Sequence, residues 1–243
     1  DARGVYKNIN MDMRQYRRLK MDVHAEAVQG YHLEDGDMVA FIRLGTDYQN
    51  NYYEYEVPLK LTPFGSYSSN STAHRYIVWP EENQINVALE LFQQVKLRRN
   101  DAMRVANSSV QLTSEYQWFD PDRPNNRVKV KGNPNLANVR TVMIGVRNRT
   151  MENKAVEVWM NELRLTDFNE KGGWAANSRM NIKLADLGSV SIAGRASTVG
   201  FGSIDQSVTE RSQENFHQYD VATNLELGKL LGPESRMSIP FYV

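Results

Sequence analysis

The chain has 243 residues, and its 29 Lys and Arg residues balance its 29 Asp and Glu residues, giving a formal net charge of zero. A neutral chain offers no electrostatic case for nucleic acid as a partner. The absence of Cys excludes disulfides, thiolate zinc sites and Cys nucleophiles. The length fits one large or two modest domains, and no run of about eighteen apolar residues predicts a membrane-spanning helix.

The first part of the chain shows the alternation of apolar and polar residues that predicts β-strands. Residues 19–27 alternate strictly and predict a strand with one buried and one wet face, on which His24 would be solvated. Residues 38–44 are mostly apolar and predict a central strand. Residues 53–60 alternate again, and Pro58, which has no N–H group, indicates that this strand lies at a sheet edge or ends there.

A long polar loop and one helix are predicted next. Residues 62–73 are rich in Ser and Asn, and such a loop is a candidate for mobility or for a binding rim. Residues 81–98 predict the helix, because Pro80 and two acidic residues suit its N-terminus and Arg98 suits its C-terminus. The apolar stripe of this helix consists of Ile85, Ala88, Leu89, Phe92 and Val95.

Three further strands complete a predicted β-sandwich. They cover residues 127–131, 138–146 and 155–165, and a change of parity in the last strand indicates a bulge near Asn161. Short strands with a single helix are typical of two packed sheets. Residues 1–168 are therefore predicted to form one soluble β-sandwich domain.

The end of this domain, VEVWMNELRLTDF, resembles the last strand of jelly-roll carbohydrate-binding modules. The resemblance implies a jelly-roll-like sandwich and allows sugar binding through exposed aromatic rings. The candidate platforms for such binding are Tyr48, Tyr52, Tyr67 and Trp118. Tyr and Trp in a β domain are more often packing residues, so glycan binding is the weaker interpretation.

Other motifs do not indicate catalysis or metal binding. No metal-binding spacing connects the four His residues, which are His24, His32, His74 and His217. Asp120 and Asp122 lie in FDPDRPNN, which lacks the Gly of a calcium loop and favours a turn. No nucleophile elbow, phosphate-binding loop or paired carboxylates occur. We therefore expect no catalytic residue, metal or cofactor, and no enzyme activity.

The last part of the chain predicts a different kind of sheet. Residues 169–178 lack periodicity and are predicted to be a linker. Residues 179–243 hold four alternating runs, joined tightly around Gly188 and Gly232 and divided by a long polar segment at 198–218. Strands of about ten residues, with short turns at one end and long loops at the other, are typical of the antiparallel wall of an outer-membrane β-barrel. A soluble sheet with one wet face produces the same alternation.

In a barrel wall the polar face lines an aqueous passage, and the apolar face contacts lipid or a neighbouring barrel. The predicted pore-facing residues are Arg179, Asn181, Lys183, Asp220, Asn224, Glu226 and Arg236. The predicted lipid-facing residues are Met180, Ile182, Leu184, Leu225, Leu227, Ile239 and Phe241. Charges of both signs on the pore side suit a wide passage for folded proteins better than a selective ion filter.

Long stretches of the chain resemble the SprA/Sov family, namely STVGFGSIDQSVTERS, QYDVATNLELGKLLGPESRMSIPFY and VWMNELRLTDFNEKGGWAANSRMNIKLADLGSVS. The opening RGVYKNINMDMRQYRRLKM is similar to the same family further upstream. Members of this family are very large outer-membrane proteins of the type IX secretion system. The resemblance implies a giant single-chain barrel that exports folded proteins. Because the chain opens at Asp1 and stops at Val243 within an alternating run, we expect it to be an internal piece of such a protein.

The resemblance also implies partners and a location. The partners are secreted cargo proteins, a PorV-like companion barrel, a periplasmic plug protein and the lipid of the bacterial outer membrane, and the family implies a role in gliding motility. Short turns of bacterial barrels face the periplasm and long loops face outside. The start of the first wall strand would then lie outside, so we expect residues 1–168 to be an extracellular insertion that caps or lines the outer mouth.

A second class of function stays open. The whole chain could be a soluble β-sandwich binding module for surface glycans, whose last four strands complete the sandwich. Detergent dependence separates the two classes, because a barrel wall predicts that residues 179–243 form an incomplete, aggregation-prone sheet outside their parent protein.

Overall fold

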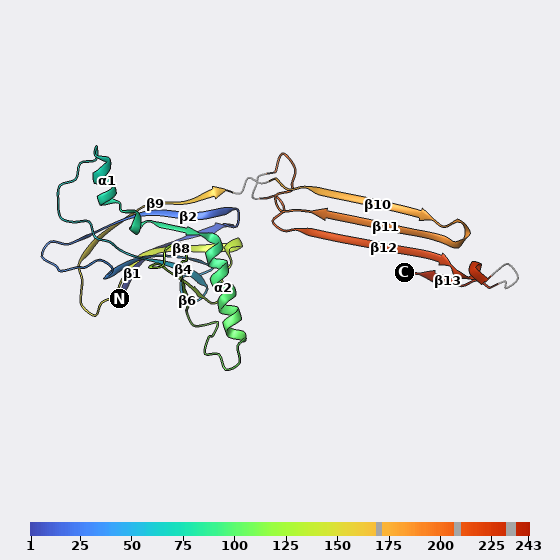
Figure 1. Ribbon diagram of the computed structural model, residues 1–243, viewed down its shortest axis with the longest axis horizontal. Helices are drawn as coiled ribbons and strands as arrows, with labels where there is room; N and C mark the ends of the chain where they lie inside the picture. Colours follow the sequence, from blue (N-terminus) through green and yellow to red (C-terminus); the bar gives the residue numbers. More distant parts are fainter. Residues whose placement is uncertain (169–171, 207–209, 232–236) are drawn as a thin grey trace. The chain divides into compact units, whose positions relative to one another are not determined.

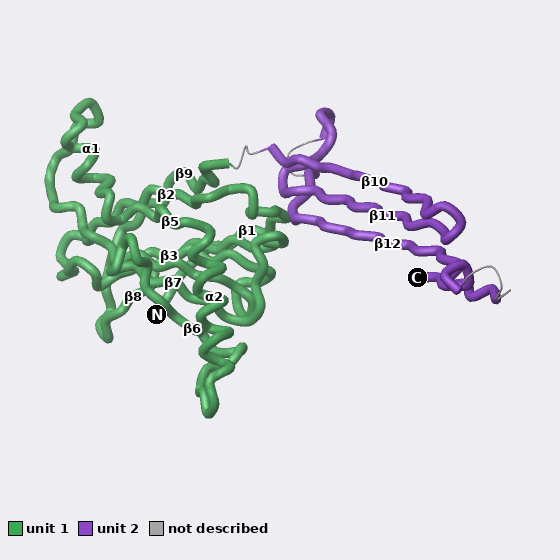
Figure 2. Tube along the Cα trace, turned by 45° about the vertical axis from the view of Figure 1, so that its right-hand side comes forward, with its two compact units in different colours: residues 1–169 green, residues 170–243 purple. Residues whose placement is uncertain are grey.

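The computed structural model describes residues 1–168, 172–206, 210–231 and 237–243. The chain is mainly β, and its sheets are antiparallel. It divides into two compact units, residues 1–169 and residues 170–243 (Figure 2). Among the described residues, none of the helices combines the length and the apolar character needed to cross a membrane.

The first unit contains a six-stranded sheet with the strand order β1-β8-β3-β4-β7-β6. In chain order these strands are β1 (Ala2–Met11), β3 (Met38–Gly45), β4 (Tyr52–Pro58), β6 (Tyr116–Phe119), β7 (Arg127–Lys131) and β8 (Val139–Asn148). Strand β4 ends at Pro58 and has partners on both sides, so Pro58 marks the end of an interior strand. Strand β1 was not predicted, because its apolar residues do not alternate strictly with polar ones, and it is held by its pairing with β8.

A second sheet of three strands has the order β5-β2-β9. Its members are β2 (Tyr16–Ala27), β5 (Ile85–Ala88) and β9 (Val156–Phe168). Figure 2 shows β2 lying between β9 and β5 in this unit. The predicted bulge in β9 is confirmed: Lys20 pairs with Arg164 while Asp22 pairs with Asn161, and Glu162 between them has a positive φ of 53°.

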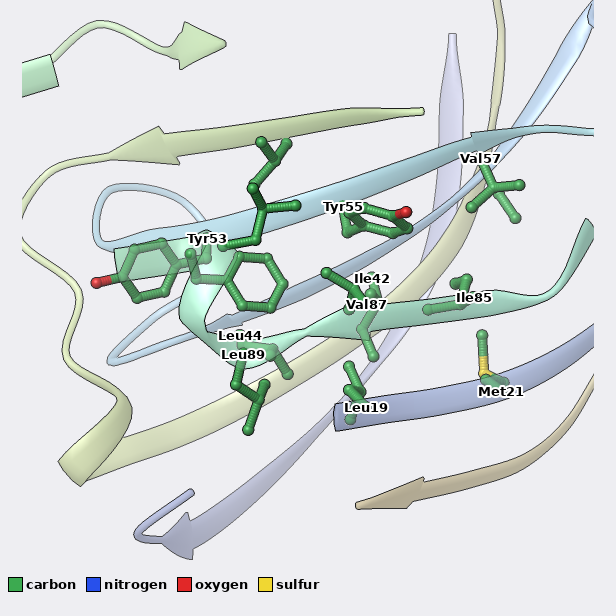
Figure 3. Packing of buried hydrophobic residues seen from close by; sticks show 14 of the residues in the cluster. Leu19, Met21, Ile42, Leu44, Tyr53, Tyr55, Val57, Ile85, Val87 and Leu89 are labelled. Carbon is green, nitrogen blue, oxygen red and sulfur yellow. The ribbon is translucent and has the colours of Figure 1, made fainter. Parts of the chain in front are cut away.

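The two sheets enclose the hydrophobic core of the first unit. Figure 3 shows Leu19 and Met21 of β2 directed into the same space as Tyr55 and Val57 of β4. All four side chains are at most 1% exposed. A β-sandwich with an apolar interior is therefore the fold that the alternation of residues predicted.

The predicted helix at 81–98 begins too early. Residues 81–83 form a short 3₁₀ turn (Glu81–Asn83), β5 follows, and helix α2 runs from Leu89–Arg104. Ile85 fits the predicted helical stripe, but it also alternates with Val87 across the polar Asn86, as in a strand. The pairing of both residues with β2 decides in favour of the strand. Phe92 and Val95 of α2 are buried in the core as expected.

A second, short helix begins at the end of the predicted loop 62–73 and continues beyond it to Val78. Helix α1 (Thr72–Val78) is labelled in Figure 1. It begins where the Ser71 hydroxyl accepts a hydrogen bond from the N–H of His74.

The prediction that His24 is solvated is wrong, because the residue is only 4% exposed. His24 Nδ1 lies 2.8 Å from the carbonyl oxygen of Val78, at the end of helix α1, and 3.1 Å from the Thr62 hydroxyl. The rings of Trp79 and Trp159 complete its surroundings, so His24 is enclosed by residues distant in sequence.

The second unit is a single four-stranded antiparallel sheet with the order β10-β11-β12-β13. Its strands are β10 (Ala175–Lys183), β11 (Gly188–Ser197), β12 (Phe216–Glu226) and β13 (Pro240–Tyr242), with 3₁₀ turns at Ala185–Leu187 and Leu227–Leu231. Strand β10 begins within the predicted linker 169–178, so residues 175–178 belong to the sheet. The predicted turn around Gly232 and the pore-facing candidate Arg236 lie outside the described residues.

Candidate functional site: a two-faced sheet

Strand register brings the predicted polar residues of the second unit onto one face. Arg179 of β10 lies opposite Ala193 of β11, which in turn lies opposite Asp220 of β12. Residues directly opposite in an antiparallel sheet share a face, and every second residue of a strand returns to it. The register therefore places on one face, here called the polar face, the side chains of Arg179, Asn181, Lys183, Asp220, Asn224 and Glu226.

The opposite face carries the predicted apolar residues that lie within strands. Met180 pairs with Ile192, and Ile192 pairs with Val221 on the other side. At the end of the sheet Leu225 pairs with Phe241. Met180, Ile182, Leu225 and Phe241 therefore share this apolar face with residues that alternate in the same way, which are Val190, Ile192 and Val221.

Three of the predicted lipid-facing residues lie just outside the strands. Leu184 precedes the 3₁₀ turn after β10, and Leu227 begins the 3₁₀ turn after β12. The N–H of Leu227 donates to the carbonyl of Ile239 at 2.8 Å, so this pairing continues one step beyond β13. Gly228 permits the close approach, because a Cβ there would meet the carbonyl oxygen of Met237 at 2.0 Å.

Arg195 belongs to the polar face and was absent from the predicted set. It lies opposite Asn177 on one side and Gln218 on the other. Its position two residues after Ala193, on the polar side of the same alternating run, was the signal in the sequence that could have identified it. A shallow hollow of about 450 Å³ lies beside it, lined by Asn177, Ser178, Arg179, Ala193, Gly194, Arg195, Gln218 and Asp220.

Charge is divided across the polar face. The cations Arg179, Lys183 and Arg195 lie on β10 and β11, whereas the acids Asp220 and Glu226 lie on β12. Neighbouring polar groups orient some of these side chains. The amide of Gln218 donates to Asp220 at 3.2 Å, and Ser238 donates its hydroxyl to Glu226 at 3.1 Å. The face is thus hydrophilic along its whole width and carries both signs of charge.

Both faces of this sheet are open to solvent in the described structure. On the apolar face Met180 is 58% exposed, Val221 60% and Tyr219 80%. A soluble domain normally buries such a contiguous apolar surface, as the first unit does between its two sheets. The exposed apolar face is therefore a surface that requires an apolar environment or a partner.

The first unit contains a second concentration of charge, on the side of the six-stranded sheet away from the core. Glu54 is fully buried, and its carboxylate lies 3.0 Å from both Lys129 Nζ and the Arg147 guanidinium and also pairs with Arg43. Burial alone would raise the pKa of Glu54, but the charges of Lys129, Arg147 and Arg43 outweigh burial and lower it. Each group in this network has a partner, so it is a structural device rather than a reactive site.

The neighbouring Glu56 extends the same network. It is 3% exposed and pairs with Lys129 at 2.8 Å, with Arg149 at 3.2 Å and with Arg147. Sequence alternation placed Glu54 and Glu56 on a wet face. The sequence could not show that three strands place cations over them.

The aromatic residues considered for sugar stacking are occupied by protein neighbours. Tyr52 is 1% exposed, with the Arg43 guanidinium 4.1 Å from its ring centre. The other three are half-buried. Their ring contacts are Tyr6 against Tyr48 at 4.7 Å, His74 against Tyr67 at 5.7 Å, and Arg98 against Trp118 at 4.6 Å. These contacts are those of packing residues.

The loop after β6 forms a turn, as the sequence favoured. Asp120 accepts hydrogen bonds from the Tyr55 hydroxyl at 2.5 Å and from the N–H of Asp122 at 2.9 Å. Asn126 donates its side-chain amide to the same Tyr55 hydroxyl at 2.9 Å. Across the described residues, no group of three or more His, Asp or Glu side chains is arranged to hold a metal ion.

The fold and the two-faced sheet define a class of protein with a β-sandwich followed by an amphipathic antiparallel sheet that does not close on itself. Comparison with protein families identifies it further. The family described as motility related/secretion protein, SprA_N, matches residues 1–243, so the chain belongs to this family. The resemblance to SprA/Sov proteins seen in the sequence is confirmed, and the chain is related to secretion. No curated protein matches the sequence.

Proposed function

We propose that this chain is a segment of an outer-membrane translocon that conducts folded proteins in type IX secretion, and that residues 175–243 form part of its barrel wall. The observation that carries the proposal is the sheet with one apolar and one polar face, both open. Only a closed barrel satisfies the edges of such a sheet within a membrane. Among the described strands, β10 and β13 each have one edge without a partner, at which further wall strands would pair.

Strand dimensions support a membrane-spanning wall. Strands β10, β11 and β12 have 9, 10 and 11 residues. A strand that crosses the hydrocarbon core needs about 9–11 residues when it is tilted. The connection from β10 to β11 is short, whereas residues 198–215 separate β11 from β12, which matches the unequal turns of bacterial barrels.

Aromatic residues cluster at the two ends of the sheet. Phe216 begins β12, and Trp174 precedes β10 and is tied to Thr198, with its N–H donating to the Thr198 hydroxyl at 2.9 Å. At the opposite end Phe241 and Tyr242 form most of β13. Aromatic girdles at both interfaces are a common feature of barrels in membranes.

The polar face supports a passage that conducts proteins rather than ions. Its charges have both signs and are spread over three strands, whereas ion filters use rings of one charge or of carbonyl groups. Transport of folded cargo through such a passage makes and breaks no covalent bonds. In this proposal the protein is not an enzyme and needs no cofactor.

The proposed orientation follows from the connections. If the short turn at Ala185–Leu187 faces the periplasm, the beginning of β10 lies outside the cell. The first unit precedes β10 and is then an extracellular domain that caps or lines the outer mouth. The proposed partners are exported cargo proteins and, as the family resemblance implies, a companion barrel and a periplasmic plug protein.

The assigned faces are tested by a matched pair of substitutions in β12 of the full-length protein. Leu225→Arg places a charge on the apolar face, at a cost of about 2–4 kcal/mol near the bilayer centre and less near the interface. Asn224→Arg places the same charge on the polar face, where water solvates it. We expect reduced outer-membrane levels for Leu225→Arg alone. Equal levels of both variants would contradict the assignment.

Glycan binding by a soluble module is the weaker candidate. The four aromatic rings considered for it contact protein neighbours, and the described strands of the second unit pair with one another in a sheet of their own. No contact among the described residues favours a sugar over a packing role.

A further inference from the structure

The two sheets of the first unit differ in width, and one side of the sandwich is left uncovered. The six-stranded sheet ends with β1 next to β8, whereas the three-stranded sheet ends at β9. On its core-facing side β1 carries Arg3, Val5 and Lys7, which lie opposite apolar residues of β8. Val5 is 68% exposed, because no strand of the smaller sheet lies over it.

Strand β9 has an unpaired edge along this open side. Within the described parts of the chain it pairs with β2 alone, and its regular part, 156–161, precedes the bulge at Glu162. Unpaired edges of long strands are templates for another strand, and proteins usually protect them by Pro, inward charges or short length. The core-facing residues Val156, Val158 and Met160 are only half-buried, and segment 156–161, which ends before the bulge, contains no Pro and no inward-pointing charge.

A hollow of about 670 Å³ lies between these elements. Its lining joins β1, β8 and β9 with the segments beside them: Asp1, Ala2, Arg3, Val28, Met38, Val146, Asn148, Asn153, Lys154, Ala155, Val156 and Val158. A strand added to β9 would pass over β1 and β8 and would cover the exposed Val5. It would extend the smaller sheet from three strands to four.

The charges beside the hollow define the chemistry of such a strand. Lys154 is already paired with Asp37 at 3.5 Å and with Glu152 at 3.2 Å. Within the described part of the chain, Arg3 and Lys7 have no acidic partner within 4.0 Å. Asp1 is the one acidic residue in the lining. Because Arg3 and Lys7 both lie on β1, the positive charges along this strand outnumber that single negative charge. On the core-facing side of β1, the order Arg3, Val5, Lys7 places an apolar side chain between two cationic ones.

We propose that this open side is a binding groove for an extended polypeptide segment in which apolar and acidic residues alternate. The main chain of the segment pairs with the free edge of β9, which provides affinity through backbone hydrogen bonds. Its apolar side chains cover Val5 and the half-buried residues of β8 and β9, and its carboxylates pair with Arg3 and Lys7. The groove belongs to the first unit alone, and the proposal is independent of the barrel wall.

The test uses the whole chain and two synthetic peptides of about seven residues, one alternating Val with Glu and the other alternating Val with Lys. Titration by calorimetry should show that the Val/Glu peptide binds at least about tenfold more tightly. Hydrogen exchange in the complex should show new protection of amides within 156–161. Equal affinity for the two peptides, or protection confined to another strand, would overturn the proposal.

Substitutions on the exposed edge strand β1 provide the matched control. Val5→Asp puts a negative charge into the groove and should weaken the Val/Glu peptide by about tenfold or more. Tyr6→Asp puts the same charge on the other face of β1, where Tyr6 is 55% exposed, and should leave binding unchanged. Combined Arg3→Glu and Lys7→Glu should reverse the preference toward the Val/Lys peptide. Retained preference in that double variant, or equal loss in both Asp variants, contradicts the groove.

Discussion

Lys129 Nζ lies 3.0 Å from Glu54 Oε1, although the Glu54 side chain is fully buried. A buried carboxylate requires partners, and Lys129 is one of the three cations that compensate the charge of Glu54. Lys129→Met should therefore lower the free energy of unfolding by about 3 kcal/mol. Urea titration of the detergent-solubilised chain, followed by Trp fluorescence, measures this change.

Lys131→Met is the control, since Lys131 lies two residues further along β7 and has no acidic partner in the described structure. It should change the free energy of unfolding by less than about 0.5 kcal/mol. If the two variants lose equal stability, the network does not stabilise the first unit in the way described.

Acid should weaken the first unit through the same carboxylate. The folded-state pKa of Glu54 lies below its ordinary value of 4.5, so the stability it contributes is complete above that value. The contribution is lost as the pH falls from about 4.5 through the lowered folded-state pKa. Glu54→Gln should flatten the decline of stability in this acidic range, as measured by urea titrations at a series of pH values. An unchanged slope in the variant would assign the decline to other groups.

His24 should hold helix α1 on the smaller sheet. Its Nδ1 atom lies 2.8 Å from the Val78 carbonyl and 3.1 Å from the Thr62 hydroxyl. His24→Ala removes these contacts, worth about 1 kcal/mol, and should speed proteolysis within residues 62–78. His32→Ala is the control, because the His32 side chain is 81% exposed. Equal cleavage rates in both variants would show that α1 is held by other contacts.

Orientation is testable with protease added to intact cells that carry the full-length protein. The loop at 66–71 is largely exposed and lies next to α1, so it should be cut if the first unit is extracellular. Cleavage that occurs only after the outer membrane is opened would place the first unit in the periplasm.

Elements with strong local patterns were predictable from the sequence. The strand Arg127–Lys131 was predicted with its observed bounds, and the parity change near Asn161 identified the bulge in β9. The register of β10, β11 and β12 follows from strict alternation, which also explains why most of the residues assigned to each face do share a face.

Features that depend on distant residues were not predictable. Ile85 fits both the stripe of a helix and the alternation of a strand, and only pairing with β2 separates the two. His24 is buried because the end of α1 contacts it at the Val78 carbonyl, and Glu54 is buried because cations from three strands cover it. Such contacts join residues far apart in sequence, which single-sequence periodicity does not register.

The most direct test of the central claim uses two neighbouring positions in the middle of β11. Because residues 1–243 contain no Cys, Ile192→Cys and Ala193→Cys each introduce one thiol into this part of the protein, on opposite faces of the sheet, and any Cys elsewhere in the full-length protein is first replaced by Ser. In outer membranes carrying the full-length protein, we predict that a water-soluble maleimide labels the Ala193→Cys variant and leaves the Ile192→Cys variant unlabelled until the membrane is dissolved. Equal labelling of both variants in intact membranes would contradict a wall with lipid on one face and water on the other.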